Sequence, residues 1–129
     1  MINVKMILNL RTDKVISLAQ KAGQKGTRDT VVAIHRDTVH DSPYLTGHNR
    51  RSMTAEVSGM GTVARGVDSE PEKVVDDSKI QGAVYSTSGY GGYLETGTHS
   101  MGARPYIKPS YDRHIKELPG NIEKHFKEL

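Results

Sequence analysis

Six histidines are the residues whose spacing most directly tests for metal chemistry in this chain. His35 and His40 are five residues apart, so on a helix they lie on opposite sides and do not share an ion. His114 and Glu117 are three apart and can share one, but two ligands do not make a metal site without further partners. We therefore expect no bound metal. We expect His35, which lies on an apolar stripe, to be a partly buried imidazole with a hydrogen-bond partner.

The serines and glycines of the second half of the chain lack the arrangement of an active site. Ser86, Ser88 and Ser100 lie near glycines, but none is in a G-x-S-x-G elbow. The glycines of 89–92 follow neither the dinucleotide-binding pattern nor a Gly-Lys-Ser/Thr loop. Their backbone freedom is better suited to a tight turn beside aromatic anchors.

Glu95 is the one acid among apolar and glycine neighbours, a setting that can perturb its pKa. A lone carboxylate in such a place more often ties a loop by accepting hydrogen bonds, and Arg104 is an available partner. We interpret it as a structural clamp. The sequence thus predicts no catalytic residue and no cofactor, and we expect a protein that is not an enzyme.

Composition favours one domain with a small apolar core. The chain has 129 residues, of which 35% are hydrophobic, and it has one Phe and no Trp. So thin an apolar supply favours completing burial against neighbouring subunits. Cysteine is absent, which excludes disulfides and thiolate chemistry. No apolar run approaches the roughly 20 residues that cross a bilayer, and no signal-peptide pattern opens the chain, so we expect synthesis in the cytoplasm and no membrane contact.

The net charge of +3 is unevenly spread along the chain. Residues 1–50 have eight Lys/Arg against four Asp/Glu, residues 51–78 have three against six, and residues 79–129 have seven against five. Dedicated nucleic-acid binders usually cluster basic residues on one face with aromatics between them. Here the basic residues are interspersed with acids, so a small cytoplasmic DNA-binding protein is the weakest of the alternatives.

Hydrophobic periodicity predicts the elements of the first half. Residues 2–10 alternate apolar and polar types, which predicts a strand. Helical stripes follow over 12–22 and from Thr27 to about Asp41, separated by a break at Gly23-Gln24-Lys25-Gly26. Pro43 disfavours continuation of the second helix.

The second half predicts a sheet and a last helix. Residues 53–57 and 63–67 form a hairpin around Gly59-Met60-Gly61, and 80–87 is a third strand of the same sheet. Between them, 68–79 reads as a flexible acidic loop. Apolar positions from Tyr111 to Leu129 keep helical spacing across Pro119, which predicts a kinked helix. The fold class is α+β: one domain, 1–129, with an N-terminal strand and helices packed on a small, mostly antiparallel sheet and a kinked C-terminal helix.

Two separated segments carry a family resemblance. The first runs from Ser42 to Met53 and the second from Tyr90 to Pro109. In this order they are similar to tail components and head–tail joining (tail-completion) proteins of long-tailed bacteriophages, with the pattern Pro-x-x-Thr-Gly-x-Leu-x-x-Ser, then Tyr-Ala-x-Tyr-x-Glu-x-Gly-Thr, then Ala-Arg-Pro-Phe-x-x-Pro-Ala. The matching residues are Pro43, Thr46, Gly47, Ser52, Tyr93, Glu95, Gly97, Thr98, Arg104, Pro105 and Pro109, with Arg51 at the strand entry. The chain departs from the pattern at the loop of His48 and Asn49, at Gly91, at Tyr106 and at Ser110.

The resemblance implies a structural virion protein of the phage neck. Such a subunit forms a ring with copies of itself, binds the head connector or stopper proteins and the tail-tube or tail-terminator proteins, and lets genomic DNA pass through the lumen without sequence-specific binding. The alternative is a tail terminator or minor tail protein.

Two surfaces are candidates for contacts in such a ring. The acidic residues Asp68, Glu70, Glu72, Asp76 and Asp77 have only Lys73 among them, and they repel DNA if they face the lumen. At least one of two apolar segments, the strand at 2–10 or the terminal stripe with Ile122, Phe126 and Leu129, is expected to contact a neighbouring subunit, since a small core does not bury both.

Overall fold

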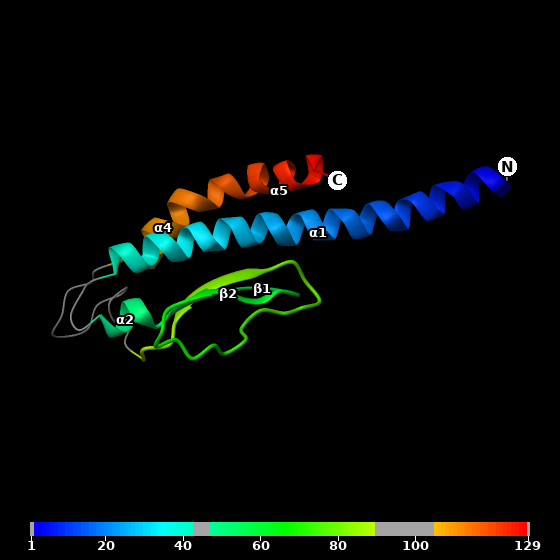
Figure 1. Ribbon diagram of the computed structural model, residues 1–129. Coiled ribbons are helices and arrows are strands. Elements are labelled where there is room, and N and C mark those ends of the chain that lie inside the picture. The colour runs from blue at the N-terminus through cyan, green and yellow to red at the C-terminus, as the bar shows by residue number, and fades with distance from the viewer. Residues whose placement is uncertain (1, 43–46, 90–104, 129) are drawn as a thin grey trace.

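The computed structural model describes residues 2–42, 47–89 and 105–128, and for residues 2–15 it describes the backbone only. One long helix, α1, lies between a small sheet on one side and the C-terminal helices on the other (Figure 1). The elements are α1 (Ile2–Asp41), α2 (His48–Arg51), β1 (Met53–Val57), β2 (Gly61–Arg65), β3 (Gly82–Ser86), α4 (Ile107–His114), the 3-10 turn η1 (Ile115–Glu117) and α5 (Leu118–Lys127). The α+β fold class predicted from the sequence is confirmed.

The first half of the chain corrects the sequence prediction. Residues 2–10 are not a strand, and 12–22 and 27–41 are not two helices, because all belong to the 40-residue helix α1. Met6, Ile7 and Leu8 are consecutive apolar residues, so the alternation of a strand is incomplete there. A strand also needs a neighbour to pair with, and the described sheet contains β1, β2 and β3 alone.

The glycines expected to break the helix are points of close packing instead. A Cβ added to Gly26 would lie 2.7 Å from the Cα of Ile122 on α5, and one added to Gly23 would lie 3.0 Å from Cδ1 of Ile80. A glycine inside a helix costs about 1 kcal/mol relative to alanine. The close approach of the two helices at Gly26 compensates for that cost, so α1 continues through both positions.

The sheet has the order β2-β1-β3 and is antiparallel throughout. The predicted hairpin is confirmed: Gly59 and Gly61 have φ angles of 77° and 74° at the turn, which glycine adopts without strain. On the face towards α1, Ala55 and Val57 of β1 pack with Val31, and Met53 packs with Tyr106.

The other face of β1 is covered by the segment that joins β2 to β3. Residues Thr54 and Glu56 point into this cover and are as buried as the apolar residues between them. The central strand is therefore buried on both faces, although the strands of the described residues form a single three-stranded sheet.

The C-terminal helical run bends as its sequence predicts. Pro119 sits in the first turn of α5, where its missing N–H costs no helical hydrogen bond, and the 3-10 turn η1 joins α4 to α5 without a loop. α5 runs back along α1 (Figure 1). Ile122, one of the expected subunit contacts, instead packs on Gly26 of its own chain, whereas Phe126 is 47% exposed. Leu129 lies outside the described residues.

Replacing Gly26 with alanine tests the close helix approach. A methyl group there meets the backbone of Ile122, so α5 must shift, and we expect a loss of about 1–3 kcal/mol in the free energy of unfolding despite the better helix propensity of alanine. Urea unfolding followed by circular dichroism measures it.

Gly120→Ala in α5 is the matched control, because a Cβ at Gly120 has no atom within 4 Å. That variant is expected to be neutral or slightly stabilised. Equal stability of the two variants contradicts the role assigned to Gly26.

Candidate functional site

A buried amide, Asn49, holds together the segments that carry the two motifs. Its Nδ2 donates to Oγ of Ser42 at 2.9 Å and to the hydroxyl of Tyr106 at 3.0 Å. Its Oδ1 accepts from the hydroxyls of Ser86 at 2.6 Å and Ser88 at 2.7 Å. The side chain is 2% exposed, and both ends of the amide are fully used. The end of α1, helix α2, the end of β3 and the approach to α4 therefore meet at one residue.

Two of the positions at which the chain departs from the phage pattern, Asn49 and Tyr106, are hydrogen-bonded to each other. Asn49 stands where the pattern has leucine, and Tyr106 stands where it has phenylalanine; in the structure the two side chains are in direct contact. Ser110, at the position of an alanine, donates its hydroxyl to the backbone oxygen of Ile34 at 2.9 Å. At these two positions this chain therefore has polar side chains that are buried and bonded to each other.

The remaining residues of the first motif lie around α2. Gly47 has φ 82°, the left-handed conformation that favours glycine, directly before the helix. Arg51 donates from Nε to Asp68 at 2.7 Å, and Ser52 donates to the backbone oxygen of His48 at 2.7 Å. Arg51 therefore connects this motif to the acidic loop. Pro43 and Thr46 lie outside the described residues.

Most of the second motif lies outside the described residues: Tyr93, Glu95, Gly97, Thr98 and Arg104. Pro105 is exposed just before α4, and Pro109 is exposed in the first turn of that helix. Ser88 and Tyr106, which flank the segment, both bind Asn49, so the two ends of the segment are held together.

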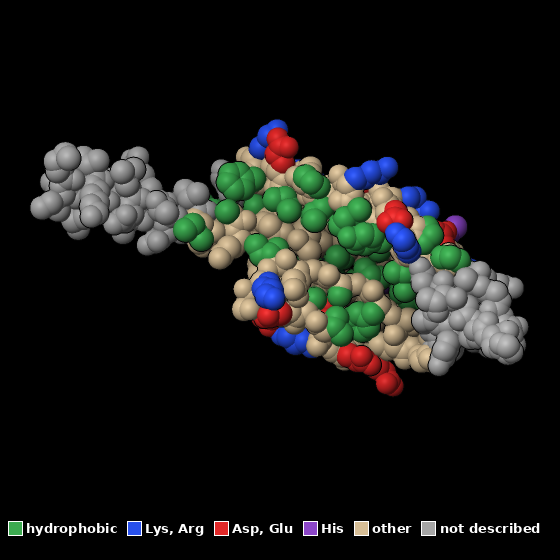
Figure 2. Space-filling view, turned by 180° about the vertical axis from the view of Figure 1, so that it is seen from behind, with side chains coloured by type: hydrophobic (Ala, Val, Ile, Leu, Met, Phe, Trp, Pro, Cys, Tyr) green, Lys and Arg blue, Asp and Glu red, His purple; other side chains and the backbone are tan. Residues whose placement is uncertain are grey.

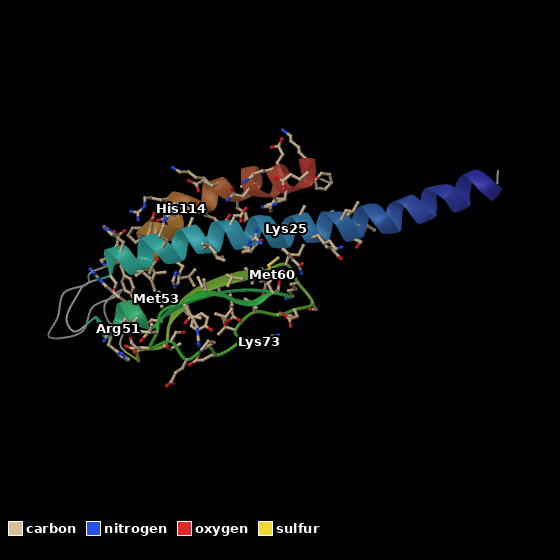
Figure 3. All side chains as sticks on the ribbon, viewed as in Figure 1. Lys25, Arg51, Met53, Met60, Lys73 and His114 are labelled. Atoms are coloured by element: carbon tan, nitrogen blue, oxygen red, sulfur yellow. The ribbon has the colours of Figure 1, made fainter. Side chains whose placement is uncertain are left out.

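An ion-pair cluster fixes α4 to α1. His114 of α4 is 11% exposed in its side chain; its Nε2 lies 2.5 Å from Asp37 of α1, and its Nδ1 lies 3.1 Å from Glu117 (Figure 3). Arg113 also reaches α1, 2.7 Å from Asp41. The hydrogen bond to Asp37 raises the pKa of His114 against the opposing effect of burial, and the same bond lowers the pKa of Asp37.

A second, similar contact fixes α5 to α1 about two helical turns away, towards the N-terminus of α1. His125 places Nε2 2.5 Å from Asp29 of α1, and Asn121 donates to the hydroxyl of Thr30 at 2.9 Å. Burial raises the pKa of Asp29, but the hydrogen bonds from His125 and Arg28 outweigh it, so the pKa is lowered. These contacts were not among those predicted from the sequence. A signal was present, because His-x-x-Glu occurs at both 114–117 and 125–128 and the two acids of α1 are eight residues apart.

His35, like His114 and His125, makes a hydrogen bond within the fold. Nε2 of His35 lies 3.0 Å from the backbone oxygen of Met53, which confirms the expected hydrogen-bonded, partly buried imidazole. Within the described ranges, no group of three or more His, Asp or Glu side chains is placed to hold a metal ion. Across the same ranges no helix is long and apolar enough to cross a membrane.

The segment between β2 and β3, which contains the acidic loop, is attached to the sheet along its length. The backbone N–H groups of Glu70, Glu72 and Val74 donate to the side chains of Thr87, Tyr85 and Glu56, at 3.0, 3.0 and 2.6 Å. The carboxylates of Glu70 and Glu72 face outward, whereas Asp68 pairs with Arg51 and His48. The loop thus presents negative charge from a fixed backbone.

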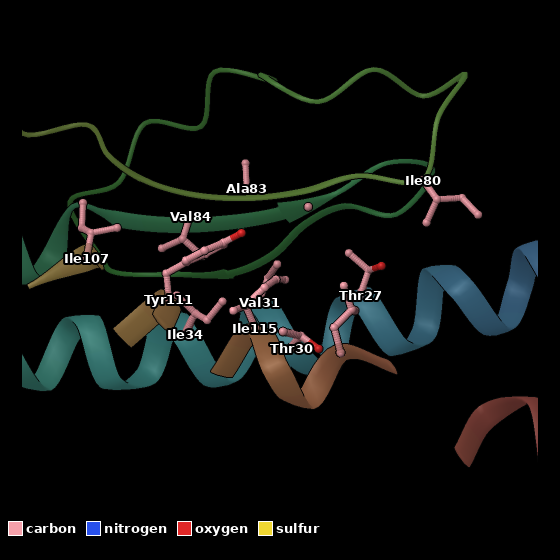
Figure 4. Close-up of a pocket in the computed structure, with 12 residues that line it drawn as sticks. Thr27, Thr30, Val31, Ile34, Ile80, Ala83, Val84, Ile107, Tyr111 and Ile115 are labelled. Atoms are coloured by element: carbon pink, nitrogen blue, oxygen red, sulfur yellow. The ribbon is translucent and has the colours of Figure 1, made fainter. Parts of the chain in front are cut away.

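An apolar groove opens between α1, β3 and the C-terminal helices, with a volume of about 370 Å³. Val31 and Ile34 of α1 form its floor, Val84 lies on the sheet side, and Tyr111 and Ile115 lie on the helical side (Figure 4). In the space-filling view, apolar side chains gather along this hollow (Figure 2). Its described lining is mostly apolar, with hydroxyl groups from Thr27, Thr30 and Tyr111.

A double-mutant cycle measures the contact between Asn49 and Tyr106. Asn49→Leu leaves four hydroxyls without this partner and is expected to cost about 3 kcal/mol, and Tyr106→Phe about 1 kcal/mol. The double variant is expected to lose about 1 kcal/mol less than the sum, because each change removes the other's unpaired group. Strictly additive losses in urea unfolding contradict the pairing.

The ion-pair cluster predicts a pH dependence of stability. A raised histidine pKa stabilises the fold fully below about pH 6.5, and this contribution is lost as the pH rises through the raised pKa. A lowered carboxyl pKa stabilises above about pH 3.8, and this contribution is lost as the pH falls through the lowered pKa. The cluster is therefore strongest between about pH 4 and pH 6.5.

His114→Gln is expected to remove about 1–2 kcal/mol at pH 6 and to flatten the loss of stability at alkaline pH, as measured by unfolding at several pH values. His40→Gln is the matched control, because the side chain of His40 is 88% exposed and its partner Asp41 keeps Arg113. An unchanged alkaline slope in the His114 variant contradicts the role of the cluster.

No protein-family model, no curated protein and no solved structure matches this chain. The resemblance to phage neck proteins therefore rests on the motif residues themselves, and what the protein does has to be inferred from its own residues and geometry.

Proposed function

We propose that this protein is a structural component of a phage virion: a ring subunit of the neck that joins the head connector to the tail tube. The observation that carries the proposal is the pair of motifs, found in order between Ser42 and Pro109. Their departures from the pattern support it, because Asn49 and Tyr106 are distant in sequence, stand at two pattern positions and bind each other.

The geometry also supports an architectural role. Asn49 holds the ends of both motif segments, and His114 and His125 fix the C-terminal helices to α1. These contacts serve to keep the subunit rigid. A ring that transmits the joining of two large assemblies needs subunits of fixed shape, since each flexible joint adds an entropic cost to association.

We further propose that the acidic loop faces the channel through which DNA passes. Among the described residues, Glu70, Glu72 and Asp76 have no ion-pair partner, and the attachment of the backbone to the sheet fixes where their charge is presented. Carboxylates at a channel wall repel the phosphate backbone and so prevent it from sticking. A density map of the neck that places residues 68–77 on the outer wall contradicts this orientation.

An amber mutation in the gene tests the function itself. We expect filled heads and complete tails of normal length that fail to join, visible by electron microscopy of the lysate. Overlong tails indicate the alternative role of tail terminator, and infectious, joined particles contradict both. Supplying the wild-type chain from a plasmid is the control that restores joining.

The same complementation assay examines the remaining candidate subunit contact. Phe126 is 47% exposed at the end of α5, so Phe126→Ala is expected to leave the isolated domain folded and yet to complement poorly. Lys127→Ala, at the neighbouring exposed position, is the matched control and is expected to complement fully. Full complementation by both variants removes Phe126 from the interface.

A further inference from the structure

The groove between α1, β3 and α4–η1 has the character of an interface that one chain leaves unfilled. Ile80 and Tyr111 on its rim are both 47% exposed, although their neighbours Val31 and Ile34 are buried. β3 is at one end of the strand order of the described sheet, and its residues Gly82, Ala83 and Val84 line the groove. An apolar hollow of this size favours a protein partner over a polar small molecule.

The same chain has an apolar segment that extends away from its own body. The sheet and α5 lie alongside the later part of α1, and its first turns project beyond them (Figure 1). Among residues 16–41, Ala22 is the first buried side chain, and Ile16 is still 51% exposed. The sequence of the projecting turns is nevertheless rich in aliphatic residues: Ile2, Val4, Met6, Ile7, Leu8 and Leu10. So apolar a helix end is stable in water only when something covers it.

We propose that the N-terminal arm of α1, residues 2–12, occupies the groove of a neighbouring copy of this chain. The inference rests on the proposed ring and deepens it by naming the contact between adjacent subunits. The arm does not reach the groove of its own chain while α1 is straight, because Val31 and Ile34 of the same helix are the floor of that groove. The occupant must come from another copy.

The symmetry of this contact is that of a ring. The arm and the groove are different surfaces, so the contact is head-to-tail, and repeated head-to-tail contacts close into a ring when the rotation permits. Two chains that merely exchanged arms would form a closed dimer. The neck proposal requires the first arrangement, so arm-to-groove contacts continue from subunit to subunit.

Charge supports the same pairing. Residues 1–14 contain Lys5, Arg11 and Lys14 against Asp13. At the Ile80 end of the groove, the loop bears Lys79, Asp77, whose partner is Lys73, and Asp76, which has no ion-pair partner among the described residues. A basic arm that enters beside the carboxylate of Asp76 gains a favourable charge contact at the rim while its aliphatic residues cover the hollow.

Cross-linking tests the contact directly, because the natural chain has no cysteine to interfere. Two full-length single variants, Met6→Cys and Ile80→Cys, are mixed at high concentration and oxidised mildly. We expect a disulfide-linked heterodimer, seen on a non-reducing gel, at a level several-fold above that given by Met6→Cys mixed with Val67→Cys. Val67 is the matched control, since it is an apolar residue that is 87% exposed and does not line the groove.

The inference is overturned if Met6→Cys cross-links equally to Ile80→Cys and to Val67→Cys, or if it gives no cross-linked species at any concentration. It is also overturned if a Met6→Cys/Ile80→Cys double variant forms the disulfide within single chains. Light scattering measures the size of the oligomer. A dimer instead of a larger oligomer would indicate that two chains exchange arms, and this overturns the head-to-tail arrangement. The neck proposal fails separately, through joined particles from the amber mutant. Cross-linking can therefore fail while the joining defect stands, and the reverse is equally possible.

Discussion

The packing of α1 against two layers at once is the constraint on which the rest of the structure depends. The sheet contacts α1 through Ala55 and Val57. On the other side α5 contacts α1 at Gly26, where Ile122 lies so close that a side chain at position 26 would clash with it. A small chain cannot build two cores, so one helix serves both layers. This explains why α1 continues through two glycines that in isolation would end a helix, since each is used for a close approach.

A chain with few large apolar residues needs another source of order, and here it is a set of buried polar side chains. Among the described residues, Asn49, Thr54, Glu56 and Ser110 are buried and hydrogen-bonded. Such bonds add little net stability, but a wrong arrangement leaves them unpaired at a cost of about 1–3 kcal/mol each. These bonds therefore disfavour other arrangements of the segments by more free energy than they add to the stability of the native one.

Local patterns in the sequence predicted the second half of the fold better than the first. The hairpin at Gly59-Met60-Gly61, the third strand and the bend before Pro119 follow from turn chemistry and proline geometry, which act within a few residues. The wrong prediction of a helix break at Gly26 arose because the role of this glycine is decided by Ile122, nearly a hundred residues away. The ion pairs of Asp29 and Asp37 were missed for the same reason: their partners lie on α5 and α4, and spacing on α1 alone does not reveal them.

The buried amide connects this rigidity to assembly. Ser88 and Tyr106 lie on either side of the second motif in the sequence, and both bind Asn49. The two ends of the motif segment are therefore fixed relative to α1 and the sheet. The groove and the projecting end of α1 belong to the same frame, since Val31 and Ile34 line the first and the helix itself leads to the second. In the proposed ring, a neighbour that binds at the groove would therefore be held at a fixed angle to the next arm. In a closed ring of that kind, this angle would determine the number of subunits.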